Sequence, residues 1–145
     1  MLQKIRKVLF HFFCWLANKL GPRTQSDNNH SKQEIEDHLI EISVVNTARG
    51  HAEVVEPGSV VAKKNDTITF KAHESDTKIW FPKMEEIFGE TNPFAVLSNK
   101  SVEKTIIKVV TKRETFPYAV YCSLSNDFAE GNSAPRIIID PPNKK

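Results

Sequence analysis

The eight residues NDTITFKA, Asn65 to Ala72, decide what kind of fold this chain can form. Ile68, Phe70 and Ala72 alternate with polar side chains, and this period of two is typical of a β-strand with one buried face. The Asn65-Asp66 pair in front of the run is a turn signal. The stretch therefore predicts a tight turn that leads directly into a half-buried strand.

Short runs of the same character lie on both sides of this strand, separated by turn residues such as Pro57-Gly58. The branched and aromatic content of these runs favours strands over helices. The segment 83–89 (KMEEIFG) has room for one to two helical turns, and 90–94 (ETNPF) is expected to be a loop. The further expected strands are 38–46 (HLIEISVVN), 52–55 (AEVV), 59–62 (SVVA), 78–82 (KIWFP), 104–112 (KTIIKVVTK), 116–123 (FPYAVYCS) and 136–140 (RIIID). About seven short strands with little helix predict an all-β sandwich or barrel.

The charge is distributed unevenly along the 145 residues. The first 23 residues contain five basic side chains and no acidic one, so the remaining residues carry 15 basic and 18 acidic side chains, a net charge of −3. A nucleic-acid-binding domain would concentrate its basic residues on the folded part. We therefore expect a basic tail on a mildly acidic domain, with no nucleic acid as partner.

The first 20 residues combine a basic start with an apolar run from Val8 to Ala17, which is about half of the ~20 residues needed to span a bilayer. One interpretation is a secretory signal. A second is an amphipathic or apolar helix lying in a membrane interface, and a third is a helix that docks on protein. The residues expected to contact a membrane are Lys4, Arg6, Lys7, Phe12, Phe13 and Trp15. We therefore expect a protein that is either associated with a membrane or exported to the periplasm or the cell surface. The cytoplasmic face of a membrane is the alternative location.

Gly21-Pro22 ends this segment, because glycine favours the helix terminus and proline cannot continue the helix. Residues 21–37 have the polar composition of a linker. We therefore expect four parts: the helix at 1–20, the linker at 21–37, one domain at 38–141 and a short tail at 142–145.

The order of the pieces in this domain resembles the cupredoxin family, the fold of the blue copper proteins. NDTITF (65–70) is similar to the family's turn and strand of the type GDTVTF, and TKIWF (77–81) is similar to its HNVxF segment. YAVYC (118–122) ends in cysteine and leads through a loop to the final strand, APRIIID (134–140). The resemblance covers Ile40 to Pro141 and implies a Greek-key cupredoxin-like β-sandwich.

The resemblance also implies a copper site, of which this chain keeps only the sulfur ligand. A blue copper centre takes two imidazoles and a cysteine thiolate, usually with a weak axial thioether. The first histidine of the family falls on Thr77, or on Lys78 if the loop is counted one residue longer. No histidine or methionine follows Cys122, and His73 is the nearest histidine before the expected position.

These residues predict a non-catalytic binding or interaction module without copper or another cofactor, whose partner is a protein or a small ligand. The alternative is an electron-transfer protein with an irregular copper site on Cys122 and His73. Catalysis by Cys122 would need a base beside the thiol, and the family arrangement supplies none. A buried cysteine that packs as a small apolar residue is the simpler interpretation of Cys122.

The loops that follow residue 72 and Cys122 are expected to meet at one end of the sandwich. They would form a surface for a ligand or partner, and oxygen donors there would suit a hard cation such as calcium. The ordinary alternatives are an exposed loop histidine, solvated acidic groups and aromatic rings in the core. Alternation predicts that one of Trp80 and Phe81 is buried. The surface residues are His73, Asp76, Ser125, Asp127, Glu130, Trp80 and Phe128.

Overall fold

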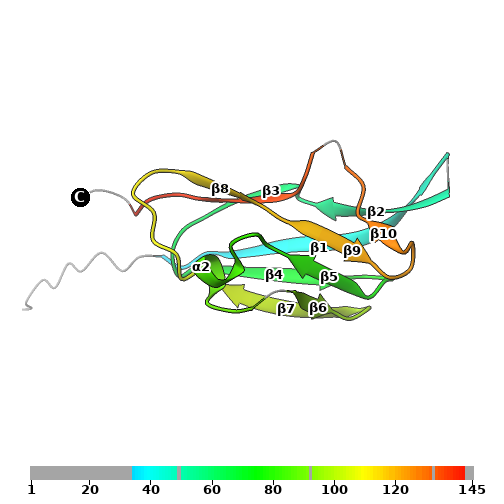
Figure 1. Ribbon diagram of the computed structural model, residues 1–145, viewed down its shortest axis with the longest axis horizontal. Coiled ribbons are helices and arrows are strands. Elements are labelled where there is room, and N and C mark those ends of the chain that lie inside the picture. The colour runs from blue at the N-terminus through cyan, green and yellow to red at the C-terminus, as the bar shows by residue number, and fades with distance from the viewer. Residues whose placement is uncertain (1–33, 49, 92, 132, 143–145) are drawn as a thin grey trace, which may run out of the picture. The chain divides into compact units, whose positions relative to one another are not determined.

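The computed structural model describes residues 34–142, except 49, 92 and 132. The helix expected at 1–20, most of the expected linker and the last three residues of the tail lie outside this part of the chain. The described residues form eleven strands and one short helix (Figure 1). Their bounds are β1 (Asp37–Thr47), β2 (Gly50–Glu56), β3 (Ser59–Ala62), β4 (Thr67–Ala72), β5 (Thr77–Trp80), α2 (Met84–Phe88), β6 (Phe94–Val96), β7 (Lys100–Thr105), β8 (Glu114–Pro117), β9 (Ala119–Cys122), β10 (Asp127–Phe128) and β11 (Arg136–Ile139).

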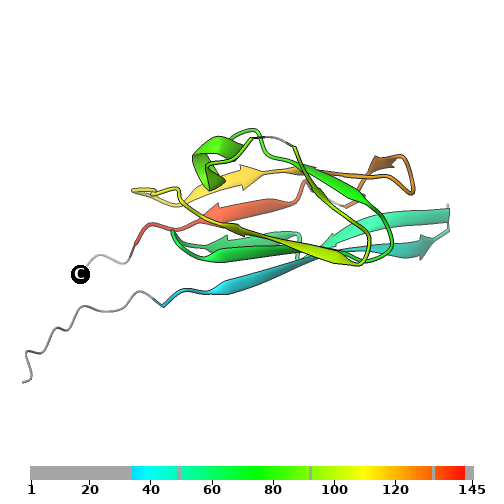
Figure 2. The same cartoon turned by 90° about the horizontal axis from the view of Figure 1, so that it is seen from below.

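The strands form three small sheets around one core. Their orders are β2-β1-β4-β7, β10-β9-β5-β6 and β3-β11-β8. Two pairs are parallel, β1 with β4 and β3 with β11, and the other strand pairs are antiparallel. In Figure 2, β1 (blue) lies on one side of this unit, and β8 and β9 (yellow to orange) lie on the other. The expected all-β sandwich is confirmed.

Strand β4 lies at the centre of its sheet and fills the middle of the core. Ile68, Phe70 and Ala72 are fully buried, as the alternation of the sequence predicts. The Phe70 ring makes edge contacts with Phe94 and Tyr118, with ring centroids 5.3 and 5.9 Å apart. Aromatic rings prefer this geometry over face-to-face contact. One strand thus joins the aromatic side chains of several others.

The turn before β4 also has the expected form. Asn65 has a φ of 74°, a left-handed conformation that asparagine tolerates better than most residues. The helix prediction is confirmed too: α2 ends at Phe88, and it is capped by Gly89, whose φ is 72° and whose N–H donates to the Glu85 carbonyl. Glycine can adopt this conformation without a side-chain clash.

The strand predicted at 104–112 is wrong. β7 ends at Thr105, and Ile106 exchanges backbone hydrogen bonds with the turn instead, donating to the Asp66 carbonyl and accepting from the Asn65 N–H. The N–H of Ile107 then donates to the Ile87 carbonyl of the helix. Partners in the turn and in α2 therefore take this segment out of the sheet, although Ile106 remains fully buried.

The strand predicted at 116–123 is divided at Tyr118. β8 pairs with β11, whereas β9 pairs with β5 in a different sheet. The Tyr118 N–H donates to the Pro135 carbonyl between the two ladders. Figure 1 shows β8 and β9 as one path that passes from sheet to sheet. Tyr118, Val120 and Cys122 alternate with less buried residues along this path, and all three are buried.

Replacement of Phe70 by alanine should destabilise the domain by about 3–5 kcal/mol, because it empties a large volume in the core. Phe128→Ala is the matched control, since Phe128 is 59% exposed, and it should cost less than ~1 kcal/mol. Urea unfolding followed by circular dichroism measures both. Equal losses for the two variants would contradict the central position of Phe70.

Candidate functional site

The two loops that the sequence places at one end of the sandwich do meet in the structure. The Ser123 N–H donates to the Asp76 carbonyl over 2.9 Å, and the Leu124 N–H donates to the Ser75 hydroxyl over 3.0 Å. The start of β5 is thereby tied to the end of β9. Cys122 lies at this junction.

Thr77 occupies the place opposite Cys122. The two residues are direct partners in the antiparallel ladder between β5 and β9. Both side chains are buried, whereas Lys78 is exposed. The Thr77 hydroxyl donates to the Val96 carbonyl over 3.3 Å. Of the two residues that the sequence resemblance aligns with the first histidine of a copper site, Thr77 is therefore the inward one and Lys78 the outward one.

Glu53 is a further member of this site that sequence reasoning missed. It lies on β2, only 2% of its surface is exposed, and its Oε1 accepts a 3.3 Å hydrogen bond from the Ser125 N–H. Its backbone carbonyl accepts from the Glu130 N–H over 2.7 Å. Because the neighbouring Ala52 is also buried, β2 does not alternate here, and no period in the sequence marks Glu53 as an inward residue.

The surroundings of Cys122 favour its neutral form. Burial raises the pKa of the Cys122 thiol, and the nearby charge of Glu53 raises it further, to about 12. Both effects have the same sign, because a thiolate loses its hydration in the interior and is repelled by a carboxylate. The thiol is therefore protonated at neutral pH, which agrees with the interpretation of Cys122 as a packed core residue.

His73 is held by a partner on another strand. Its Nε2 lies 3.0 Å from Glu41 Oε1, and the His73 side chain is about one third exposed. This hydrogen bond is the main cause that lowers the pKa of Glu41, and Lys71 contributes through its charge. Within the described ranges, neither Cys122 nor His73 belongs to a group of three or more metal-binding side chains with ligand atoms within 4.8 Å.

The acidic side chains near this end turn to separate backbone partners. Glu74 Oε2 accepts from the Val44 N–H over 3.1 Å, and Asp76 Oδ1 accepts from the Ser98 N–H over 2.7 Å. Asp127 Oδ1 accepts from the N–H of Phe128, the next residue, over 2.7 Å. Glu74 and Asp76 thus tie the loop after β4 to β1 and to the loop before β7, and the described carboxylates at this end do not form a cation-binding group.

The aromatic residues of the predicted surface lie on the outer face of the sheet β10-β9-β5-β6. Trp80 is 47% exposed, whereas Phe81, the next residue, is fully buried. The rings of Tyr121 and Phe128 meet edge to face, with centroids 5.7 Å apart. The interpretation as core side chains is therefore wrong for Trp80 and Phe128, because Trp80 points outward in the alternation and both residues of β10 are exposed. It is correct for Phe81 and Tyr118.

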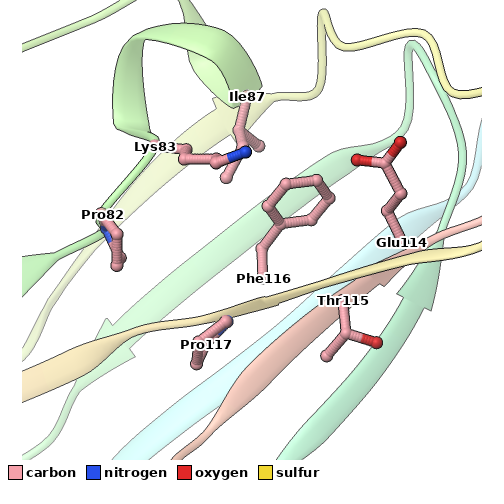
Figure 3. Close-up of a pocket in the computed structure, with 7 residues that line it drawn as sticks. All are labelled: Pro82, Lys83, Ile87, Glu114, Thr115, Phe116 and Pro117. Atoms are coloured by element: carbon pink, nitrogen blue, oxygen red, sulfur yellow. The ribbon is translucent and has the colours of Figure 1, made fainter.

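A pocket of about 270 Å³ lies elsewhere, between the start of α2 and strand β8 (Figure 3). Its lining is Pro82, Lys83, Ile87, Glu114, Thr115, Phe116 and Pro117. None of the site residues expected from the sequence contributes to it. A second pocket, of about 250 Å³, includes Glu130 and the backbone that leads into β11. Neither pocket includes Trp80, Tyr121 or Phe128.

Comparisons with known proteins find similarity in structure. No family model matches the sequence, and no curated protein matches it. Among solved structures, a reduced amicyanin variant has a TM-score of 0.44 at 13% identity, over 72% of this chain and 82% of that one. A purple cupredoxin from Nitrosopumilus maritimus has a TM-score of 0.44 at 15% identity, over 72% of this chain and 100% of that one.

A pseudoazurin from Sinorhizobium has a TM-score of 0.44 at 19% identity, over 74% of this chain and 76% of that one. These similarities concern the fold and leave the chemistry of this chain open. The strand pairing places a buried cysteine at the end of β9, opposite the first residue of β5. In fold, the chain is an all-β sandwich.

Proposed function

We propose that this chain is a non-catalytic cupredoxin-like binding module that works without copper. The observation that carries the proposal is the pairing of Cys122 with Thr77, where the family resemblance implies an imidazole. A threonine hydroxyl is a poor copper ligand, and Thr77 already donates to the Val96 carbonyl. Two imidazoles and a thiolate are the set that suits copper in both oxidation states.

Glu53 supports the same proposal through electrostatics. Its charge disfavours the Cys122 thiolate, which both a copper centre and a cysteine nucleophile require. Reactive cysteines are found in positive, partly exposed surroundings, whereas this one is fully buried beside an acid. We therefore propose no enzymatic role for the thiol.

The alternative, an electron-transfer protein that uses Cys122 and His73, has less support. The His73 ring lies against Glu41, and the His73 carbonyl accepts hydrogen bonds from the Asn99 N–H and the Ser98 hydroxyl. For His73 to bind a copper ion at Cys122, its ring would have to break the hydrogen bond to Glu41 while the hydrogen bonds to its carbonyl keep the backbone in place. The contacts favour a structural role for His73.

The binding face in this proposal is the outer face of β10-β9-β5-β6, which we call the aromatic face and define by Trp80, Tyr121 and Phe128. Tyrosine and tryptophan often dominate the binding energy of protein interfaces. The Tyr121 hydroxyl donates to Asn126 Oδ1 over 2.6 Å, which orients the ring at the edge of the face. Lys78, the ladder partner of Tyr121, adds a positive charge beside the rings.

A protein is the partner that we propose for this face. Small ligands bind in concave pockets that enclose most of their surface, and these rings line neither of the two pockets described above. An open sheet face with several aromatic side chains suits a broad contact instead. Because Lys78 lies beside the rings, a partner with acidic groups around an apolar patch would complement it.

Membrane association or export through residues 1 to 20 is a further part of the proposal, and it rests on the sequence pattern alone. No helix among the described residues is long and apolar enough to cross a membrane. The basic and aromatic side chains of the first 20 residues are those expected of an interfacial segment.

Addition of Cu²⁺ to the full chain should give no intense visible thiolate-to-copper band. The sample should carry Cys14→Ser, so that Cys122 is the sole thiol. Matched variants with Cys122→Ser or His73→Ala should give the same spectrum. An intense band that disappears on Cys122→Ser would contradict the copperless module, and its loss in His73→Ala would establish the irregular copper site.

A photo-crosslinking residue at position 78 should join the protein to one partner in the cells that produce it. The adduct should be lost when Trp80→Ala and Phe128→Ala are combined, because these changes remove the two most exposed rings. The control places the crosslinker at Glu103 on β7, in a different sheet. An adduct that persists without the two rings, or one that forms equally from position 103, would argue against the aromatic face.

A further inference from the structure

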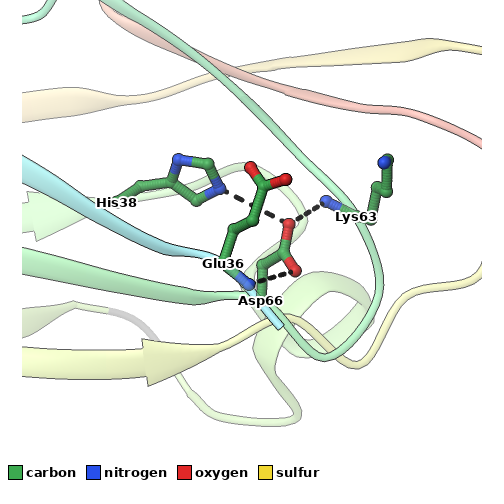
Figure 4. A network of polar contacts seen from close by, with 4 residues as sticks. All are labelled: Glu36, His38, Lys63 and Asp66. Carbon is green, nitrogen blue, oxygen red and sulfur yellow. Dashed lines mark hydrogen bonds and ion pairs between the residues drawn. The ribbon is translucent and has the colours of Figure 1, made fainter. Parts of the chain in front are cut away.

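Three side chains of the types that can bind a metal ion come together at the end of β4 that is opposite to His73. β1 and β4 run parallel, with Asp37 paired to Thr67, so the start of β1 lies beside the turn before β4. Glu36, His38 and Asp66 each offer one ligand atom, and these three atoms all lie within 4.8 Å of one another. Figure 4 shows the imidazole and the two carboxylates turned toward a common point.

Asp66 is the fixed member of this group. Only 1% of its surface is exposed, and its carboxylate accepts hydrogen bonds from two backbone N–H groups. Oδ1 accepts from the Glu36 N–H over 3.1 Å, and Oδ2 accepts from the Lys63 N–H over 2.7 Å. Each carboxylate oxygen has a second lone pair, so Oδ2 can still bind another group. The backbone thus holds one oxygen ligand in place before any ion arrives.

The distance between His38 and Asp66 fits two ligands of one ion. Nε2 and Oδ2 lie 3.4 Å apart, which is long for a hydrogen bond with a usual length of about 2.9 Å. Two ligands at ~2.1 Å from a tetrahedral ion are separated by roughly 3.4 Å. The imidazole side chain is 18% exposed, so an ion can reach it from solvent.

We propose that Glu36, His38 and Asp66 bind one divalent transition-metal ion, for which Zn²⁺ has the matching chemistry. Zinc accepts imidazole nitrogen and carboxylate oxygen at similar bond lengths. The imidazole argues against calcium and magnesium, which prefer oxygen ligands throughout. Three protein ligands leave a fourth position for water. The site lies at the opposite end of β4 from Cys122 and is independent of the proposed binding function.

The test titrates the full chain with Zn²⁺ alone by calorimetry and with Co²⁺ alone by visible absorption. We expect a site for one ion, with Co²⁺ bands typical of nitrogen and oxygen ligands in tetrahedral geometry. His38→Gln and Glu36→Gln should each weaken binding by at least tenfold, on the order of the loss caused by disturbing a metal site. His73→Gln is the matched control and should bind as tightly as the unmodified chain, because His73 has a single carboxylate partner.

Glu36→Gln also separates the loss of a ligand from the loss of the fold, since Glu36 is exposed and its backbone N–H is unchanged by the substitution. Its melting temperature without metal should equal that of the unmodified chain. The proposal is overturned if the full chain binds neither ion, if His38→Gln binds Zn²⁺ with unchanged affinity, or if Co²⁺ gives a thiolate band that depends on Cys122.

Discussion

The register of β4 is the constraint on which the rest of the domain depends. Ile68, Phe70 and Ala72 must all face the core, and a shift of one residue against β1 or β7 would turn all three toward solvent. The same register fixes what lies at the two ends of the strand. Asp66 is held beside the start of β1, and His73 is held at the loop that leads to β5, where its N–H donates to the Ile42 carbonyl.

The elements that depend only on local sequence preferences could be predicted from the sequence. The alternation in β4, the asparagine turn before it and the glycine that ends α2 each follow from local preferences. The segment after Thr105 could not be predicted, because its partners are the turn and the helix and not another strand. The division at Tyr118 could not be predicted either, because buried and more exposed side chains alternate without interruption through β8 and β9 although the two strands belong to different sheets.

The sequence predicted which end of the sandwich holds the candidate site, but it did not predict all the side chains that lie there. The loops after residue 72 and after Cys122 were expected to meet, and they do; the pairing of Cys122 with Thr77 is visible only in the structure. Glu53 could not be found, because it comes from a strand without clear alternation and some 70 residues before Cys122 in the chain. The exposure of Trp80 depends on which face of β5 meets the core, a choice that two adjacent aromatic residues leave open.

We propose that Cys122 serves only the packing of the sandwich. Burial and the charge of Glu53 keep the thiol neutral, and we propose that the outer aromatic face is the part of the domain that contacts a partner. In this proposal, packing depends on the inward side chains, and recognition depends on the outward side chains of β5, β9 and β10.

The most direct test is a pH titration of the Cys122 thiol in the full chain with Cys14→Ser, followed by thiolate absorbance and by the rate of alkylation. The pKa of about 12 predicts almost no thiolate up to pH 10 and, at pH 8, alkylation on the order of a thousandfold slower than for an unfolded control. Because the unfolded thiol titrates near its ordinary value of 9.0, folding stability should fall between pH 9 and 12. A pKa at or below 9 in the folded protein would contradict the central claim, since Cys122 would then be available as a thiolate.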